Sequence, residues 1–123
     1  MNEEPLSVLV VEDIEVNLKL MVLVLERGGF RVTSARTARE ALACLERERF
    51  DVIALDIKLP DMDGLDLARR LKADPRTSSI PIVATTAFAM KGDAERALAA
   101  GCDFYLTKPI DTRPLAETIR QYV

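Results

Sequence analysis

The sequence predicts one α/β domain over residues 1–123, built as a doubly wound, five-stranded parallel sheet between helices in a three-layer sandwich. Five short apolar runs alternate strictly with five segments of helical period, strand first. The clearest runs do not alternate apolar with polar residues, which is typical of parallel strands covered on both faces. Right-handed crossovers between such strands favour double winding.

The five strands are expected where short apolar runs are bounded by polar or breaker residues. The runs Val-Leu-Val-Val and Val-Ile-Ala-Leu, in the first and third strands, are uniformly apolar. The expected strands cover residues 6–11, 30–33, 52–55, 80–85 and 104–106.

Helices are expected in the five intervening and terminal segments, where apolar residues recur at helical spacing. Thr37 and Glu40 form a capping box at the start of the second helix, and Gly101 ends the fourth. The apolar residues that recur at this spacing are Leu18, Met21, Val22 and Leu25; Ala38, Ala41, Leu42 and Leu45; Leu65, Ala68 and Leu71; Ala94, Ala97 and Leu98; and Leu115, Ile119 and Tyr122.

The composition excludes several classes of function. Seventeen basic against twenty acidic residues give a net charge of −3, which disfavours direct nucleic-acid binding. Histidine is absent, so Ser-His and Cys-His nucleophile pairs and imidazole metal sites are excluded. The acidic first residues do not resemble a secretory signal, and the apolar run at 20–25 is too short to span a bilayer. We therefore expect a cytoplasmic protein.

Ionisable or hydroxyl side chains follow four of the five predicted strands. Each alone is readily explained as a loop residue or a helix N-cap. Together they are expected to meet, because ligands of doubly wound sheets bind beyond the carboxyl ends of the strands. The set comprises Glu12 and Asp13, Asp56, Thr85 and Thr86, and Thr107 with Lys108.

Three carboxylates in one crevice favour a divalent cation. Each pair repels by about 4 kcal/mol at 4 Å for an effective dielectric near 20, more than a helix dipole or one lysine would offset. An all-oxygen set formed by Glu12, Asp13 and Asp56 suits Mg²⁺ or Mn²⁺.

A metal, a lysine and a hydroxyl around one carboxylate can stabilise a transferring phosphoryl group, with that carboxylate as nucleophile. Asp56 is the candidate, because it leaves the predicted sheet centre just before the chain turns away. Gly64, at the end of this turn, is expected to serve the turn or the helix start rather than a ligand.

Four segments together resemble the receiver domain of two-component response regulators, the CheY-like superfamily. They are VVED at 10–13, LDIKLPDMDG at 55–64, TTA at 85–87 and YLTKP at 105–109, and the resemblance runs from about Leu6 to the end. The segment 86–93 is most similar to single-domain regulators of the DivK type. The resemblance implies a flavodoxin-like fold with strand order 2-1-3-4-5.

The resemblance also assigns roles at the site. Asp56 becomes the phosphoacceptor, with Glu12 and Asp13 as metal-site acids, one acting through water, and the backbone carbonyl of Lys58 as a further ligand. Glu12 stands where many relatives carry Asp, which leaves the coordination distance open. Thr86 corresponds to the hydroxyl that moves toward the phosphoryl oxygen, and Lys108 to the ion-pair partner of that oxygen.

Further roles follow from the same resemblance. Tyr105 is the aromatic residue whose rotamer follows Thr86, and Pro109 fits a cis Lys-Pro peptide. Lys58 and Phe88 flank the phosphoryl group, and a bulky Phe88 is expected to exclude water and prolong the phosphorylated state.

Part of the first predicted helix is expected to expose an apolar strip. Leu20, Leu23 and Val24 lie off its buried stripe. A helix that is simply well buried is the alternative. In the resembling family this helix docks the phosphodonor, so Leu20 is a candidate partner contact.

The expected function is a phosphorylation-driven switch. The phosphoryl group comes from a histidine kinase or histidine phosphotransfer protein in a Mg²⁺-dependent reaction, and the signal passes to a downstream protein target, without nucleic-acid or membrane contacts. The only chemistry expected is the protein's own phosphorylation and dephosphorylation. Because the last predicted helix ends with the chain, output is expected through partners.

Several alternatives stay open or are disfavoured by sequence features. The chain could be a receiver domain excised from a hybrid histidine kinase or a multidomain regulator. A Mg²⁺-dependent phosphatase with an aspartyl nucleophile is disfavoured, because such enzymes resemble Asp-x-Asp and this chain has Asp56-Ile57-Lys58. A nucleotide or flavin carrier would need a phosphate-binding glycine loop that the sequence lacks. A degenerate receiver used only for docking would not need the complete site.

Overall fold

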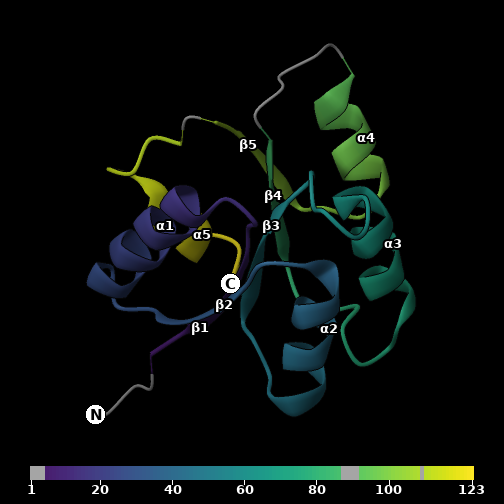
Figure 1. Ribbon diagram of the computed structural model, residues 1–123, viewed down its shortest axis with the longest axis horizontal. Helices are drawn as coiled ribbons and strands as arrows, with labels where there is room; N and C mark the ends of the chain where they lie inside the picture. The colour runs from purple at the N-terminus through teal and green to yellow at the C-terminus, as the bar shows by residue number, and fades with distance from the viewer. Residues whose placement is uncertain (1–4, 87–91, 109) are drawn as a thin grey trace.

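A computed structural model describes residues 5–86, 92–108 and 110–123 and confirms the predicted fold class (Figure 1). Five strands pair in parallel in the order β2-β1-β3-β4-β5. This is the order that the family resemblance implied. The strands are β1 (Ser7–Val11), β2 (Arg31–Ala35), β3 (Val52–Asp56), β4 (Ile82–Thr86) and β5 (Phe104–Thr107).

Helices cover both faces of the sheet. The helices are α1 (Glu15–Arg27), α2 (Ala38–Arg47), α3 (Gly64–Ala73), α4 (Asp93–Ala99) and α5 (Leu115–Arg120). One core cluster joins α1 and α5 to the sheet, and a second joins α2, α3 and α4 to its other face (Figure 1). In the described part of the chain, no helix combines the length and the apolar character that crossing a membrane requires.

Burial along the strands follows their place in the sheet. All five residues of β3 and all five of β4 are buried, as are the last four of β1. The edge strands β2 and β5 keep several residues exposed or half-buried, because each has only one neighbouring strand. The prediction of two covered faces is therefore confirmed for the three central strands only.

Several predicted strand boundaries are wrong by one or two residues, most clearly those of β2 and β4. Strand β2 starts at Arg31, because buried Phe30 turns back to α1 and its N–H donates to the carbonyl of Leu25 at 3.0 Å. Strand β4 starts at Ile82 rather than at residue 80. Pro81 lacks an N–H and contributes only its carbonyl, which accepts the N–H of Ile53 at 2.9 Å.

The predicted helix signals are confirmed in part. Thr37 Oγ1 accepts the N–H of Glu40 at 3.0 Å and so caps α2, as predicted. The return contact of the capping box differs, because Glu40 Oε1 accepts the N–H of Arg36 at 3.0 Å, one residue before the N-cap. Gly101 follows α4 with a φ of +105°, a left-handed conformation that favours glycine.

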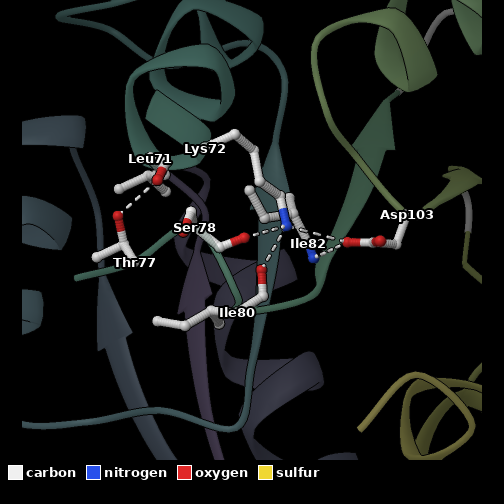
Figure 2. A network of polar contacts seen from close by, with 7 residues as sticks. All are labelled: Leu71, Lys72, Thr77, Ser78, Ile80, Ile82 and Asp103. Carbon is white, nitrogen blue, oxygen red and sulfur yellow. Dashed lines mark hydrogen bonds and ion pairs between the residues drawn. The ribbon is translucent and has the colours of Figure 1, made fainter. Parts of the chain in front are cut away.

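A polar network links α3 to the starts of β4 and β5, at the sheet edge opposite to the carboxyl ends (Figure 2). Lys72 Nζ donates to the carbonyls of Ile80 at 2.8 Å and Ser78 at 3.3 Å, and lies 3.4 Å from Asp103 Oδ2. The same Asp103 oxygen accepts the N–H of Ile82 at 2.8 Å. This network stabilises the fold. It lies at the amino ends of the strands, whereas the polar residues singled out in the sequence lie at the carboxyl ends.

Candidate functional site

Parallel pairing brings the polar strand ends together at one edge of the sheet. Asp56 is the last residue of β3 and pairs with Thr85, while Thr86 ends β4 and pairs with Thr107 at the end of β5. Glu12 follows β1 directly, and its N–H donates to the carbonyl of Ala35 at 3.0 Å. Four strands therefore present their terminal side chains at this edge, as predicted.

Three carboxyl groups form an acidic cluster at this edge. Glu12, Asp13 and Asp56 each offer one oxygen, and these oxygens all lie within 4.8 Å of one another. Glu12 is 1% exposed and Asp56 is 3% exposed, whereas Asp13 is half-buried. Two of the three carboxyl groups are thus largely shielded from water. Repulsion between charged groups is stronger in such a buried environment than in water.

Lys108 partly neutralises the cluster. Its Nζ lies 2.5 Å from Glu12 Oε1 and 3.3 Å from Asp56 Oδ2. The backbone N–H of Lys108 donates to the carbonyl of Thr86 at 2.7 Å, which extends the β4–β5 pairing and places the side chain over the acids. Burial acts against the charged ammonium, but hydrogen bonding with Glu12 and attraction by both carboxylates raise the pKa of Lys108.

The environment of Asp56 favours its neutral form when no cation is bound. Burial, together with hydrogen bonding and repulsion from Glu12, raises the pKa of Asp56 to about 7, against the opposing attraction of Lys108. Asp56 Oδ1 accepts the N–H of Lys58 at 3.1 Å, which fixes the orientation of the carboxyl group. A carboxyl group with such a shifted pKa in a cluster of acids is typical of a functional site.

The ionisation and the hydrogen bonding of Glu12 indicate whether the cluster fits a metal ion. Burial acts to raise its pKa, but hydrogen bonds with Asp56 and Lys108 outweigh burial and hold the pKa below its usual value, so Glu12 is ionised. Among the described residues its Oε2 is buried without a hydrogen-bond donor. Three acids facing one ammonium, with an unpartnered carboxylate oxygen, fit a hard divalent cation such as Mg²⁺.

Gly64 allows the loop after β3 to return to the strand end. A Cβ atom at Gly64 would lie 2.5 Å from the carbonyl oxygen of Asp56 and 2.6 Å from Cα of Ile57, so a larger residue would displace this backbone. The N–H of Gly64 donates to the carbonyl of Ile57 at 2.7 Å, and Gly64 begins α3. The expected role at the helix start is confirmed, and the close approach to Asp56 adds a reason that the sequence did not reveal.

Comparison with known proteins identifies the class to which this arrangement belongs. The profile of the response regulator receiver domain matches residues 8–120. The chain belongs to the response regulator receiver domain family. It is 43% identical to the polar-differentiation response regulator DivK of Brucella anthropi over 119 residues, which is 97% of each chain. The DivK protein of Brucella ovis is 42% identical over 117 residues, 95% of each chain.

Solved receiver structures share the fold. The receiver domain of a sensor histidine kinase from Pseudomonas aeruginosa has a TM-score of 0.87 and 35% identity over 96% of this chain and 97% of that one. That structure holds a magnesium ion coordinated in its active-site cleft. The chemotaxis response regulator CheY4 of Vibrio cholerae has a TM-score of 0.90 and 27% identity, over 97% of this chain and 99% of that one.

The residues expected to act as the switch of the receiver domain are only partly defined by geometry. Thr86 is buried at the end of β4, one residue after Thr85, which is the register partner of Asp56. Tyr105 lies in β5, pairs with Ala84 of β4 and is half-buried against the core cluster that includes residues of α4. Phe88 and Pro109 lie outside the described residues. The switch role of Thr86 and Tyr105, the cis peptide and the role of Phe88 therefore stay predictions.

Lys58 contacts the acidic cluster through its main chain. Its backbone N–H contacts Asp56, whereas its side chain is exposed. The expected metal ligation by its carbonyl and the expected control of hydrolysis by its side chain both stay predictions.

The exposed apolar strip on α1 differs from the predicted one by one residue. Leu20 and Leu23 are each 47% exposed, but Val24 is half-buried and packs against the core cluster shared by α1 and α5. Val16, which was not predicted to belong to the strip, is exposed one turn before Leu20. The strip therefore comprises Val16, Leu20 and Leu23.

Proposed function

We propose that this receiver domain accepts a phosphoryl group on Asp56 from the phosphohistidine of a histidine kinase or histidine phosphotransfer protein, in a reaction that depends on Mg²⁺ or Mn²⁺. The observation that carries the proposal is the position of Asp56, whose carboxyl group lies 3.3 Å from Lys108 Nζ and shares an acidic cluster with Glu12 and Asp13. Outside this cluster, no carboxyl group in the described part of the chain lies in such a group of acids beside a half-buried lysine.

The residues around Asp56 suit nucleophilic attack on phosphorus. An Asp56 carboxylate oxygen forms the new O–P bond while the P–N bond to the donor imidazole breaks and its electron pair returns to nitrogen. Glu12, Asp13 and Asp56, with the main-chain carbonyl of Lys58 as a further ligand, would hold the cation, which would neutralise charge at the transferring phosphoryl oxygens. The Lys108 ammonium and the Thr86 hydroxyl would stabilise the same oxygens.

The pKa of Asp56 links nucleophile and cation. A neutral carboxyl group is a weak nucleophile, and burial with Glu12 raises the pKa of Asp56 to about 7 in the metal-free protein. A bound cation and the ammonium of Lys108 both favour the ionised form. In this proposal, binding of the cation therefore also favours the ionised, nucleophilic form of Asp56.

Phosphorylation is then proposed to change protein contacts through Thr86 and Tyr105, and these contacts would pass the signal to a downstream protein. Leu20, on the exposed strip of α1, is the proposed contact for the phosphodonor. The cytoplasmic location expected from the sequence is part of the same proposal.

The test is intact-mass spectrometry after treatment with acetyl phosphate. Wild type with Mg²⁺ should gain one phosphoryl group, and the gain should vanish with a chelator or in Asp56→Asn. Asp66→Asn is the matched control, because Asp66 is an exposed acid in the first turn of α3 that pairs with Arg69. Undiminished labelling of Asp56→Asn would contradict the proposal.

A further inference from the structure

The loop between β3 and α3 is fastened to the start of α2 by one carboxylate. Asp61 Oδ1 accepts the N–H of Ala38 at 2.9 Å, and Asp61 Oδ2 accepts the N–H of Arg39 at 3.0 Å. Both amides belong to the first turn of α2, where N–H groups have no partner inside the helix. These hydrogen bonds hold the pKa of Asp61 below its usual range, so the acceptor is ionised. Asp61 thus joins the β3–α3 loop to a helix turn that is more than twenty residues away in the chain.

Helix α2 has a second cap that does not involve this loop. Thr37 Oγ1 accepts the N–H of Glu40 at 3.0 Å and belongs to the turn that precedes α2. Thr37 and Asp61 therefore satisfy different amides of one helix turn, and only Asp61 also reaches the loop after β3. Substitution of Thr37 therefore changes the capping of α2 alone, whereas substitution of Asp61 changes both the capping of α2 and the attachment of the loop.

The loop that Asp61 holds includes the main chain beside Asp56. At its base, the N–H of Lys58 donates to Asp56 Oδ1 at 3.1 Å, and a bridge pairs Lys58 with Asp63. Asp61 lies between these two bridged residues, at the far part of the loop. The turn before α2 also reaches the other acidic loop, because Arg36 Nη2 donates to the carbonyl of Asp13 at 3.3 Å.

Apolar packing alone does not fix the orientation of this loop. Leu59 and Met62 are half-buried and pack against the core cluster shared with α2 and α3. Such contacts are not directional, whereas two hydrogen bonds from backbone amides to one carboxylate set both the distance and the angle of the loop.

We propose that Asp61 is a positioning residue of the phosphoacceptor site, which holds the β3–α3 loop against α2 so that the main chain of Lys58 stays beside Asp56. The inference rests on the proposed function, because the groups being positioned are those that would hold the cation and orient the nucleophile. Outer groups of this kind commonly change metal affinity by about 10- to 100-fold when removed.

The test compares Asp61→Ala with Thr37→Ala, which removes a cap from the same helix turn without touching the loop. Mg²⁺ affinity is measured by isothermal titration calorimetry, stability by thermal unfolding, and phosphorylation by the rate of labelling with acetyl phosphate. Both variants should unfold at a lower temperature than wild type. Only Asp61→Ala should bind Mg²⁺ about tenfold more weakly and be labelled more slowly. Asp61→Asn, which keeps one acceptor oxygen, should lie between the two in Mg²⁺ affinity.

Wild-type Mg²⁺ affinity in Asp61→Ala, or an equal loss of affinity in Thr37→Ala, would overturn the positioning role. If Asp61→Ala does not fold, Asp61→Asn decides, since wild-type affinity in that variant overturns the role and weakened affinity supports it. A wild-type protein that neither binds Mg²⁺ nor becomes labelled would instead overturn the proposed function. The two failures are therefore distinguishable.

Discussion

Lys108 Nζ lies 3.3 Å from Asp56 Oδ2, although the two residues are 52 positions apart in the sequence. The contact depends on the parallel order of β3, β4 and β5, which places the end of each strand at the same edge of the sheet. It couples the charge of the proposed nucleophile to the last strand of the sheet. Phosphorylation of Asp56 would alter the partners of this lysine first.

Removal of the Lys108 charge should slow phosphorylation. Lys108→Met is expected to lower the rate of labelling by acetyl phosphate about 100-fold at saturating Mg²⁺, because a preorganised cation beside the phosphoryl oxygens is lost. The rate is measured by intact-mass spectrometry over time.

The control for this experiment is Lys72→Met, at the opposite edge of the sheet. Lys72 pairs with Asp103 and two loop carbonyls, so its loss should lower the free energy of unfolding by about 1–3 kcal/mol and leave the labelling rate unchanged. Labelling of Lys108→Met at the wild-type rate would show that this lysine does not serve phosphoryl transfer.

The stability of the metal-free protein should fall as pH rises from about 4 to about 7. In this window folded Asp56, with its pKa raised to about 7, holds a proton that the unfolded chain has lost, at most about 1.4 kcal/mol per pH unit. The lowered pKa of Glu12 acts in the opposite direction and only below about pH 4.5.

Urea unfolding across this pH range in the presence of a chelator measures the effect. Asp56→Asn should lack the decline between pH 4 and 7, and saturating Mg²⁺ should stabilise wild type more at pH 7 than at pH 5. A flat profile in wild type would mean that Asp56 titrates near its ordinary pKa.

An acidic residue on the exposed strip of α1 should impair the protein donor selectively. Leu20→Glu is expected to slow phosphotransfer from a purified histidine kinase that labels wild type, because it places a charge in an apolar contact. Labelling by acetyl phosphate should be unchanged. Leu98→Glu on α4, where the leucine is 54% exposed, is the matched control and should not slow transfer from the kinase. Equal slowing with both donors would indicate a damaged fold instead.

The phosphorylated state should be long-lived, well beyond seconds. The family resemblance implies that a bulky Phe88 excludes the attacking water, and the Lys58 side chain has no carboxylate or amide to orient that water. Loss of the aspartyl phosphate is followed by mass spectrometry after the donor is removed. Phe88→Ala and Lys58→Asn should each accelerate it, and fast decay in wild type would contradict this prediction.

The sequence sufficed for the fold class and for the acids of the candidate site. Uniformly apolar runs mark parallel strands, and the carboxyl ends of such strands meet, so Glu12, Asp13 and Asp56 could be placed together without a structure. The edge strand β2 was harder, because its half-exposed residues lack a clear apolar run.

Contacts between residues that are far apart in the sequence and share no motif could not be predicted. Lys72 and Asp103 are 31 residues apart, and no motif links them. Asp61 caps α2 only because the β3–α3 loop folds toward that helix, a geometry that local patterns do not encode. The raised pKa of Asp56 likewise depends on burial beside Glu12, which only the folded chain creates.

The most direct test of the central claim is to map the modified residue. After labelling with acetyl phosphate and Mg²⁺, borohydride reduction converts an aspartyl phosphate to homoserine, which peptide mass spectrometry can locate. The account predicts one converted residue, Asp56, and no conversion when Mg²⁺ is chelated. Conversion at Asp13 or another carboxylate, with Asp56 unchanged, would contradict it.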